Sequence, residues 1–231
     1  MSITTFILGE SGTGKSTALR HLNPQHTLLI QIRPKPLPFR SPEWRIRTKG
    51  EDGTASGNIF VSDDPRKIIL MLQNLSDQFD VVVIDDFQYL MSNEFMRGVT
   101  DEAKGNSQFM KFNHIAKNAF DVIDAATQCP AGKRIYILAH TQTEDSGKVR
   151  IKTVGKLLDE KIVLEGMVTI VLRTQVINGN YLFATHNNGN DTVKTPMGMY
   201  QDDLIDNDLS EVDKTICRYY GITPQPDKEQ A

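Results

Sequence analysis

The chain has 231 residues, of which 39% are hydrophobic, and its formal net charge is −3. This length favours one domain with a single core, expected over residues 1–221, followed by a flexible tail at 222–231. The acidic balance argues against a protein coated in basic surface for tight duplex DNA binding, but it leaves room for a local basic strip. Two distant cysteines, Cys129 and Cys217, predict neither a disulfide framework nor a zinc site. Free thiols, the lack of a basic leader and the lack of a long apolar run predict a cytoplasmic protein without membrane contact.

Strands and helices alternate in the first part of the chain. Short apolar, β-branched runs predict strands at 3–8, 27–32, 59–61 and 79–84. Helical spacing predicts helices at 15–22, 66–75 and 109–126. Four prolines between 33 and 42 exclude a helix there and predict an extended crossing. The strand at 79–84 contains the run VVVI, which is apolar on both faces, as in a central strand of a parallel sheet covered by helices on both sides.

The second part of the chain begins with a predicted strand at 134–139 and then becomes more polar. A short helical stretch is expected at 157–162, and a β-hairpin is expected from 167–173 and 181–185 around Asn178-Gly179, a strong turn signal. A closing helix is predicted at 209–220. Together these elements predict an α/β fold: a doubly wound, mostly parallel sheet with a C-terminal β-hairpin and a closing helix.

A phosphate-binding motif follows the first predicted strand directly. The residues GESGTGKS fit the pattern GxxxxGK[ST], with the strand before and the helix after that the motif requires. In such a loop successive N–H groups and the helix N-terminus bind phosphate. Lys15 is expected to neutralise β- and γ-phosphate charge, and Ser16 to ligate Mg²⁺. The nucleotide-binding residues predicted here are Gly9, Glu10, Ser11, Gly12, Thr13, Gly14, Lys15, Ser16 and Thr17.

Polar residues at the carboxyl ends of two later strands complete the predicted site. Asp85 follows the VVVI run and is expected to hold Mg²⁺ beside Ser16. Asp86 has two open roles, either orienting or deprotonating an attacking water or capping the helix that begins near Phe87. His140 follows the strand at 134–139, where it either senses the γ-phosphate or simply ends the strand.

Two segments are candidates for contact with nucleic acid. Lys148, Arg150 and Lys152 alternate with apolar residues, so an extended backbone would place all three cations on one face. That face either follows a phosphate backbone or is an ordinary lysine-bearing edge. A predicted loop at 92–106 carries Arg97 and Lys104 among acidic residues. Trp44, which lies among arginines in the chain, either stacks on a base or packs against the protein.

The chain resembles the RecA-like P-loop ATPases, in particular small phage-encoded, AAA-domain nucleotide-binding proteins linked to single-strand annealing and recombination. The segments that carry the resemblance are FILGESGTGKST, KPLPFR, VVVIDDFQYL, ILAHTQTE, GKLLDEKI and VKTPMGMY. They extend over most of the chain, and the first and third are specific to P-loop proteins in general.

The resemblance implies ATP and Mg²⁺ as ligands, single-stranded DNA as a partner, self-association, and possible phage or host recombination proteins as further partners. It also implies DNA contacts from the segments 92–106 and 144–156, and it matches Lys194 to a lysine that reaches the neighbouring subunit's nucleotide. One departure is clear. RecA-type enzymes carry a catalytic glutamate after the second core strand, but QIRPK at 31–35 offers none, so Asp86 is the expected water-positioning residue.

Three functional classes remain open from the residues alone. The first is a recombination ATPase that handles DNA, the second a small-molecule kinase, and the third a nucleotide switch that acts on a protein partner without DNA-stimulated turnover. A P-loop kinase usually needs an arginine-rich lid, whereas the arginine-rich stretch here precedes the VVVI strand.

Overall fold

A mostly parallel sheet forms the centre of the computed structural model, which describes residues 1–51, 53–99 and 106–224 and leaves the side chains of 106–109 undescribed. Its strands, with one small separate hairpin, are β1 (Ile3–Gly9), β2 (Thr27–Gln31), β3 (Thr48–Lys49), β4 (Ala55–Ser56), β5 (Ile59–Val61), β6 (Val81–Asp85), β7 (Arg134–Thr143), β8 (Val149–Ile151), β9 (Ile170–Ile177), β10 (Asn180–Ala184) and β11 (Leu204–Asp206). The α-helices are α1 (Pro65–Gln73), α2 (Gln88–Gly98), α3 (Asn106–Thr127) and α4 (Leu209–Tyr220). Shorter turns of helix are the 3₁₀ helices η1 (Ser16–His21) and η3 (Leu164–Met167) and the π-helix η2 (Leu157–Lys161).

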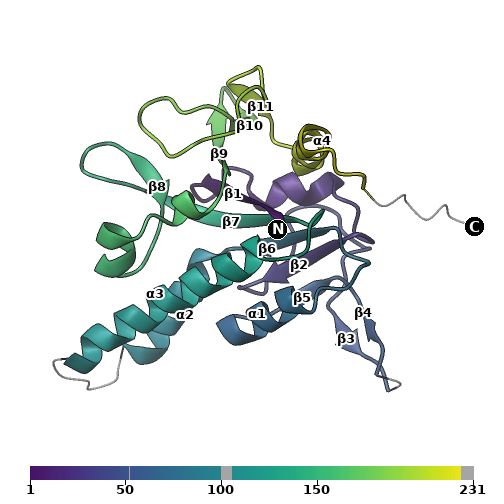
Figure 1. The fold of residues 1–231 in the computed structure, drawn as a ribbon, viewed down its shortest axis with the longest axis horizontal. Coiled ribbons are helices and arrows are strands. Elements are labelled where there is room, and N and C mark those ends of the chain that lie inside the picture. Colours follow the sequence, from purple (N-terminus) through teal and green to yellow (C-terminus); the bar gives the residue numbers. More distant parts are fainter. Residues whose placement is uncertain (52, 100–105, 225–231) are drawn as a thin grey trace, which may run out of the picture.

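The strand order in the main sheet is β11-β10-β9-β1-β7-β6-β2-β5, and β8 pairs with β7 outside this path. Strands β9, β1, β7, β6, β2 and β5 run parallel, whereas β10 and β11 extend one edge in antiparallel fashion. The separate hairpin of β3 and β4 projects from the body of the molecule (Figure 1). Parallel strands end at one edge of a sheet, so the carboxyl ends of β1, β6 and β7 meet there.

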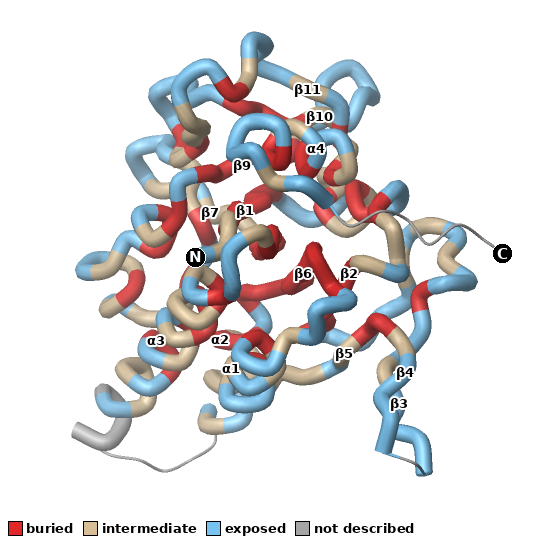
Figure 2. The backbone as a smooth tube through the Cα atoms, turned by 45° about the vertical axis from the view of Figure 1, so that its right-hand side comes forward, coloured by how far each residue is buried: buried red, intermediate tan, exposed pale blue. Residues whose placement is uncertain are grey.

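Helices cover both faces of the sheet (Figure 1). The helices α1, α2 and α3 pack on one face with Phe6, Val82 and Ile84, and η1 and α4 pack on the other with Ile7 and Val83. Successive strand residues alternate between the two cores, as the pleat requires. Figure 2 shows the central strands buried along their length, while β3 and β4 lie in the solvent.

Local sequence signals explain where several elements begin and end. Asp64 caps α1 by accepting a hydrogen bond from the Arg66 backbone N–H, with Pro65 at the first helical position. Gly221 ends α4 in the left-handed conformation, with φ of 65°. Asn178 and Gly179 have φ of 52° and 81°, which is the geometry of the tight hairpin turn predicted between β9 and β10.

Several expectations about element boundaries were wrong, among them the strand expected at 167–173, which is β9 at Ile170–Ile177. The predicted loop at 92–106 is helical over Ser92–Gly98, because Leu90 and Met91 bury one side of α2 against α3. The strand predicted to end at Ala139 continues to Thr143, because β8 folds back and pairs with Thr141 to Thr143. His140 therefore lies within a strand, not after one.

The α/β fold class is confirmed, with the predicted hairpin at β9 and β10 and the closing helix at α4. The division into a domain at 1–221 and a tail at 222–231 stays a prediction, and most of that tail, 225–231, lies outside the described residues. Trp44 is 9% exposed and packs in the core with Leu29 and Ile59, which agrees with packing and not with base stacking. None of the helices in the described ranges is long and apolar enough to cross a membrane.

Candidate nucleotide site

The loop after β1 has the backbone that a phosphate cradle needs. Gly12 and Gly14 have φ of 81° and 95°, in the region where a side chain is strained. A Cβ at Gly9 would lie only 1.8 Å from the Thr174 hydroxyl, so glycine is required there by the close approach of β9. The loop then leads into η1, which begins at Ser16 directly after Lys15.

Lys15 folds back over this loop. Its Nζ donates hydrogen bonds to the carbonyl oxygens of Gly9 (2.8 Å) and Glu10 (2.7 Å), and the residue is only 7% exposed. Burial lowers the pKa of Lys15 to about 8, although the carboxylates of Asp85 and Asp86 partly oppose this. The ammonium thus lies at the centre of the loop that the motif defines.

Ser16 and Asp85 meet although they are 69 residues apart in the chain. The Ser16 hydroxyl lies 3.1 Å from Oδ1 and 2.9 Å from Oδ2 of Asp85, which is 1% exposed at the end of β6. Burial raises the pKa of Asp85, and the adjacent Asp86 carboxylate raises it further. A hydroxyl and a carboxylate are hard oxygen donors of the kind that Mg²⁺ takes together with substrate phosphates, so the pair fits that ion. The described residues contain no cluster of three or more His, Cys, Asp or Glu side chains that would hold a metal without such phosphates.

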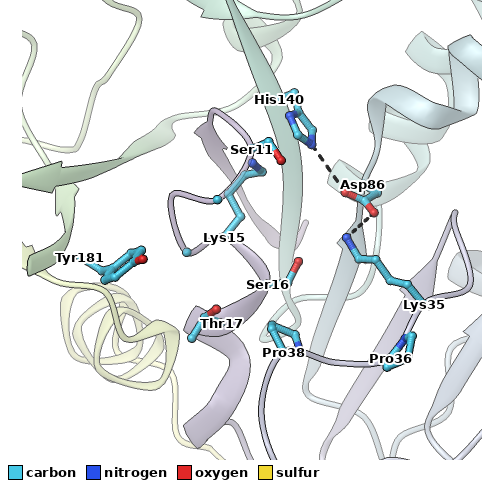
Figure 3. A pocket seen from close by; sticks show the side chains of 12 residues that line it. Ser11, Lys15, Ser16, Thr17, Lys35, Pro36, Pro38, Asp86, His140 and Tyr181 are labelled. Carbon is cyan, nitrogen blue, oxygen red and sulfur yellow. Dashed lines mark hydrogen bonds and ion pairs between the residues drawn. The ribbon is translucent and has the colours of Figure 1, made fainter. Parts of the chain in front are cut away.

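Asp86 is held in an unusual backbone conformation between the side chains of Lys35 and His140. Its φ is 62°, a region that non-glycine residues seldom occupy, and such strain is often found at functional positions. Its Oδ2 lies 2.5 Å from Lys35 Nζ, and its Oδ1 lies 3.8 Å from His140 Nε2. Burial alone would raise the pKa of Asp86, but His140 and Lys35 outweigh it and lower the pKa. Asp86 precedes α2, and its side chain points to these partners (Figure 3).

Lys35 is a site residue that the sequence did not reveal. It stands in the proline-rich crossing after β2, and its carbonyl accepts a hydrogen bond of 3.0 Å from the Gln31 side chain. Its Nζ also lies 3.9 Å from Asp85 Oδ2. Burial would lower the pKa of Lys35, but the carboxylates of Asp85 and Asp86 outweigh it and raise the pKa. The available signal was a lysine just after a core strand in a segment stiffened by Pro34 and Pro36.

A cavity of about 460 Å³ is lined by the phosphate loop together with Lys35, Asp86 and His140. Figure 3 shows Lys35, Asp86 and His140 grouped on one side of the phosphate loop, with Tyr181 and Thr17 on the other side. Tyr181, Pro36 and Pro38 are further lining residues that were not predicted from the sequence. The residues that line the cavity are Ser11, Gly12, Gly14, Lys15, Ser16, Thr17, Lys35, Pro36, Pro38, Asp86, His140 and Tyr181.

The predicted DNA-contacting residues do not form one free basic face. Arg150 lies 2.7 Å from Glu144 and 3.8 Å from Asp159, so its charge is largely used within the protein. Arg97 lies in α2 and pairs with Asp63 at 2.7 Å. Lys104 lies outside the described residues. Acidic residues from the neighbouring turn and from η2 therefore reach Arg150, and the DNA contacts expected of Lys148, Arg150 and Lys152 stay a prediction.

Lys148 and Lys152 are exposed on either side of β8. Lys152 also lines a small cavity of about 220 Å³ with Glu10, Ser11 and His140. This cavity shares Ser11 and His140 with the larger one, so the β8 segment adjoins the phosphate loop.

Lys194 is placed on the hairpin side of the sheet. Its backbone exchanges two hydrogen bonds with Val171 of β9, at 3.0 and 2.8 Å. It is not among the residues that line the larger cavity in the described part of the chain. The role expected of Lys194, contact with the nucleotide of a neighbouring subunit, stays a prediction.

Comparison with known proteins places this site in a family. No curated protein matches the sequence. The profile of the AAA domain family matches residues 1–196, which include the phosphate loop, Lys35, the Asp85-Asp86 pair, His140 and Lys194. Because the match covers most of the chain, the protein belongs to the AAA domain family of P-loop ATPases.

Proposed function

We propose that the chain binds Mg-ATP in the 460 Å³ cavity, hydrolyses it, and couples this to single-stranded DNA in recombination or annealing, as a RecA-like protein of phage type. The observation that carries the nucleotide part is that Lys15 and Ser16 of the phosphate loop and Asp86 directly after β6 converge on one cavity, where Ser16 also bonds to Asp85. AAA domains are ATPase domains that usually use Mg²⁺, which agrees with the donor set.

The chemistry follows from the charges around the phosphate loop. A triphosphate oxygen would replace the loop carbonyls as the acceptor for Lys15, and Mg²⁺ would accept Ser16 and Asp85 as oxygen ligands. When bound, Mg²⁺ supplies charge neutralisation between the β- and γ-phosphates. Asp86 is the carboxylate placed to orient or deprotonate a water at the γ-phosphate.

Lys35 and His140 are proposed to act on the γ-phosphate together with Asp86. A γ-phosphate between these groups competes with Asp86 for the Lys35 ammonium, which frees the carboxylate to accept a proton from water. His140 lies in β7, just before the residues 141–143 that pair with β8. A hydrogen bond from His140 to the γ-phosphate would therefore make the conformation of the paired β7 and β8 depend on which nucleotide is bound.

The proposal that DNA binds is supported by the position of the two lysines that flank β8. Lys148 and Lys152 are exposed, and Lys152 adjoins the γ-phosphate side of the site through the smaller cavity. A single strand that follows β8 would therefore lie next to the group that changes on hydrolysis. Each phosphate neutralised on a single strand contributes a slope of about −0.7 in log affinity against log salt.

The second candidate is a nucleotide switch that acts on a protein partner without DNA-stimulated turnover. It is favoured by the acidic net charge of −3 and by the internal pairing of Arg97 and Arg150, which leaves less free basic surface than a DNA-binding face needs. The two proposals differ in what DNA does to the rate of ATP hydrolysis.

The deciding experiment measures ATP hydrolysis with and without a single-stranded oligonucleotide at modest salt. Stimulation supports the recombination ATPase, and an unchanged rate supports the switch. In parallel, the salt dependence of oligonucleotide binding is compared between the wild type and the double variant Lys148→Ala, Lys152→Ala. The expected slope is flatter by roughly 1.4 in the double variant, because two phosphate contacts are lost.

A matched control removes the same charge elsewhere. Lys117 and Lys214 are exposed lysines on α3 and α4, each in an ion pair within its own helix. The variant Lys117→Ala, Lys214→Ala should keep the wild-type slope. If the slope is unaltered in the Lys148→Ala, Lys152→Ala variant, or is flattened equally in the control, these two lysines do not bind DNA.

A further inference from the structure

An aromatic ring stands at the end of the cavity opposite to the proposed γ-phosphate position. Tyr181 is 51% exposed and lines the cavity with Gly14 and Thr17. Figure 3 shows it across the phosphate loop from Asp86 and His140. A side chain at Gly14 would meet the Tyr181 ring at 2.9 Å, so the ring already lies against the loop.

The hairpin that carries Tyr181 is tied to the phosphate loop at more than one point. On β9, the Thr174 hydroxyl lies 2.5 Å from the Thr13 hydroxyl and donates to the Leu8 carbonyl at 3.2 Å. On β10, the Tyr181 carbonyl accepts a hydrogen bond of 3.2 Å from the Asn207 backbone N–H. The ring is therefore presented to the cavity from a fixed backbone, which lowers the entropy that binding has to overcome.

A buried amide beside this ring has no use within the described part of the protein. Asn207 is 3% exposed, and among the described residues neither its Nδ2 nor its Oδ1 has a hydrogen-bond partner. Both atoms lie 3.2 Å from the position that a Cβ at Gly14 would take. Its backbone carbonyl is held at 2.6 Å by Arg20 of η1, so the residue is anchored. A buried polar group without a partner is costly, and an amide with both atoms unpaired next to a ligand cavity points to a ligand.

We propose that Tyr181 and Asn207 form the nucleobase subsite and that the base is adenine. The proposal rests on the nucleotide site proposed above, because Lys15, Ser16 and Asp85 fix the β- and γ-phosphates. With the γ-phosphate toward Asp86, the sugar and base extend past Gly14 and Thr17 to Tyr181.

The two side chains serve different parts of the base. The Tyr181 ring stacks on its face, and such stacking is tolerant of base identity. The Asn207 amide offers a donor and an acceptor together, which complements the N6 and ring-nitrogen edge of adenine. The amide atoms are covered in this structure, and Asn207 is not among the described residues that line the cavity, so docking of the base includes a local movement that opens them.

The test compares ligands with and without a base. Titration calorimetry measures the binding of Mg-tripolyphosphate, and of the magnesium complexes of non-hydrolysable ATP and GTP analogues, to the wild type, Tyr181→Ala, Tyr181→Phe and Asn207→Ala. Tyr220→Ala removes an exposed tyrosine on α4 as the matched control. We expect Tyr181→Ala to weaken ATP-analogue binding by roughly 5- to 100-fold with tripolyphosphate binding unchanged. Tyr181→Phe and the control should match the wild type.

Asn207→Ala should weaken binding of the ATP analogue and reduce the ratio of its affinity to that of the GTP analogue. Equal ATP-analogue affinity in Tyr181→Ala and wild type would overturn the stacking role. An equal loss of tripolyphosphate binding in Tyr181→Ala would also overturn it, because the ring would then be supporting the phosphate loop. If Asn207→Ala keeps the wild-type preference for the ATP analogue over the GTP analogue, the Asn207 amide does not recognise adenine. If the wild type binds neither the analogues nor tripolyphosphate, the nucleotide site itself fails, and this outcome differs from the others.

Discussion

Lys15 donates hydrogen bonds to two carbonyl oxygens of the loop, those of Gly9 and Glu10, and the Glu10 carbonyl also accepts one from the Thr13 hydroxyl. Lys15→Met keeps much of the aliphatic stem and removes the charge. We expect Mg-ATP binding to be lost, because the phosphate charge is no longer neutralised. The free energy of unfolding should fall by no more than about 1–3 kcal/mol, the cost of leaving the Gly9 and Glu10 carbonyls without this donor. Calorimetric titration and thermal unfolding measure the two effects, and an unchanged affinity would contradict the phosphate-site assignment.

Asp85 and Asp86 are adjacent in sequence but differ in their partners. Asp85→Asn should weaken the Mg²⁺ dependence of ATP binding, since its carboxylate meets Ser16. Asp86→Asn should keep binding and lower the rate of hydrolysis by about 10²- to 10⁴-fold, the range for loss of a general base. Asparagine tolerates positive φ, so this substitution tests the carboxylate without adding strain at the φ of 62°. Equal loss of binding in both variants would show that the division of roles is wrong.

Among the elements, α4 is attached to the sheet through a buried charge. Asp213 accepts two hydrogen bonds of 3.0 Å from Arg134 at the start of β7 and one of 2.6 Å from the Tyr136 hydroxyl. Burial would lower the pKa of Arg134, but Asp213 outweighs it and raises the pKa. Asp213→Ala should lower the free energy of unfolding by about 3–5 kcal/mol, because Arg134 is left buried and unpaired. Denaturant unfolding measures this loss.

The double variant Asp213→Leu, Arg134→Met serves as the control for that interpretation. Replacement of both charges with apolar side chains should recover much of the lost stability, since no uncompensated charge remains. If the double variant is as unstable as Asp213→Ala, packing and not charge explains the effect.

A second contact at the start of α4 predicts a dependence on pH. Asp208 caps the helix through the Ser210 backbone N–H and lies 2.6 Å from His21 of η1. Burial would raise the pKa of Asp208, but the bonds from His21 and Ser210 outweigh it and lower the pKa. A carboxyl whose pKa is lower in the folded state stabilises the fold above its unfolded value of 3.8, and this contribution is lost as the pH falls through the folded value.

Asp208→Asn keeps a capping side chain and removes the charge. It should therefore be less stable than the wild type at pH 6, and the difference should shrink below pH 3.8. Urea unfolding at both pH values measures the difference. A deficit that stays constant with pH would assign the effect to the cap alone.

At the scale of the whole molecule, the site residues that belong to short local motifs could be predicted from the sequence. The site residues that folding brings together from distant positions could not. The sequence alone identifies Gly9 to Ser16 and Asp85, because phosphate and magnesium binding require particular residue types in a particular local context. Lys35 meets Asp86 from 51 positions away, and no local pattern encodes that distance. The ion pairs of Arg150 with Glu144 and Asp159, and of Arg97 with Asp63, were likewise not predicted, because the residue pattern around each arginine does not show which carboxylate it meets after folding.

Lys194 concerns more than one copy of the chain, since we propose that it reaches a neighbouring subunit's triphosphate. The motivation is its match to the RecA pattern and its place before Thr195 and Pro196, where proline stiffens the chain. A cation supplied across a subunit boundary stabilises charge on the γ-phosphate, and an arginine in this role contributes on the order of a thousandfold or more. Lysine is a compact point charge, and Lys35 already offers a cation from within the subunit, so a smaller contribution is expected here.

Mixing two inactive variants tests the shared site. Lys194→Ala subunits, intact at Lys15, are combined with Lys15→Ala subunits, intact at Lys194. Each variant alone should hydrolyse ATP poorly, but the mixture places an intact Lys15 beside a neighbour's Lys194 and should recover part of the activity. Size-exclusion chromatography confirms that each variant assembles like the wild type, and Lys35→Met, whose defect lies within its own subunit, should restore no activity to Lys15→Ala. Full turnover by Lys194→Ala alone, or an assembled mixture that stays inactive, would show that the site is complete within one subunit.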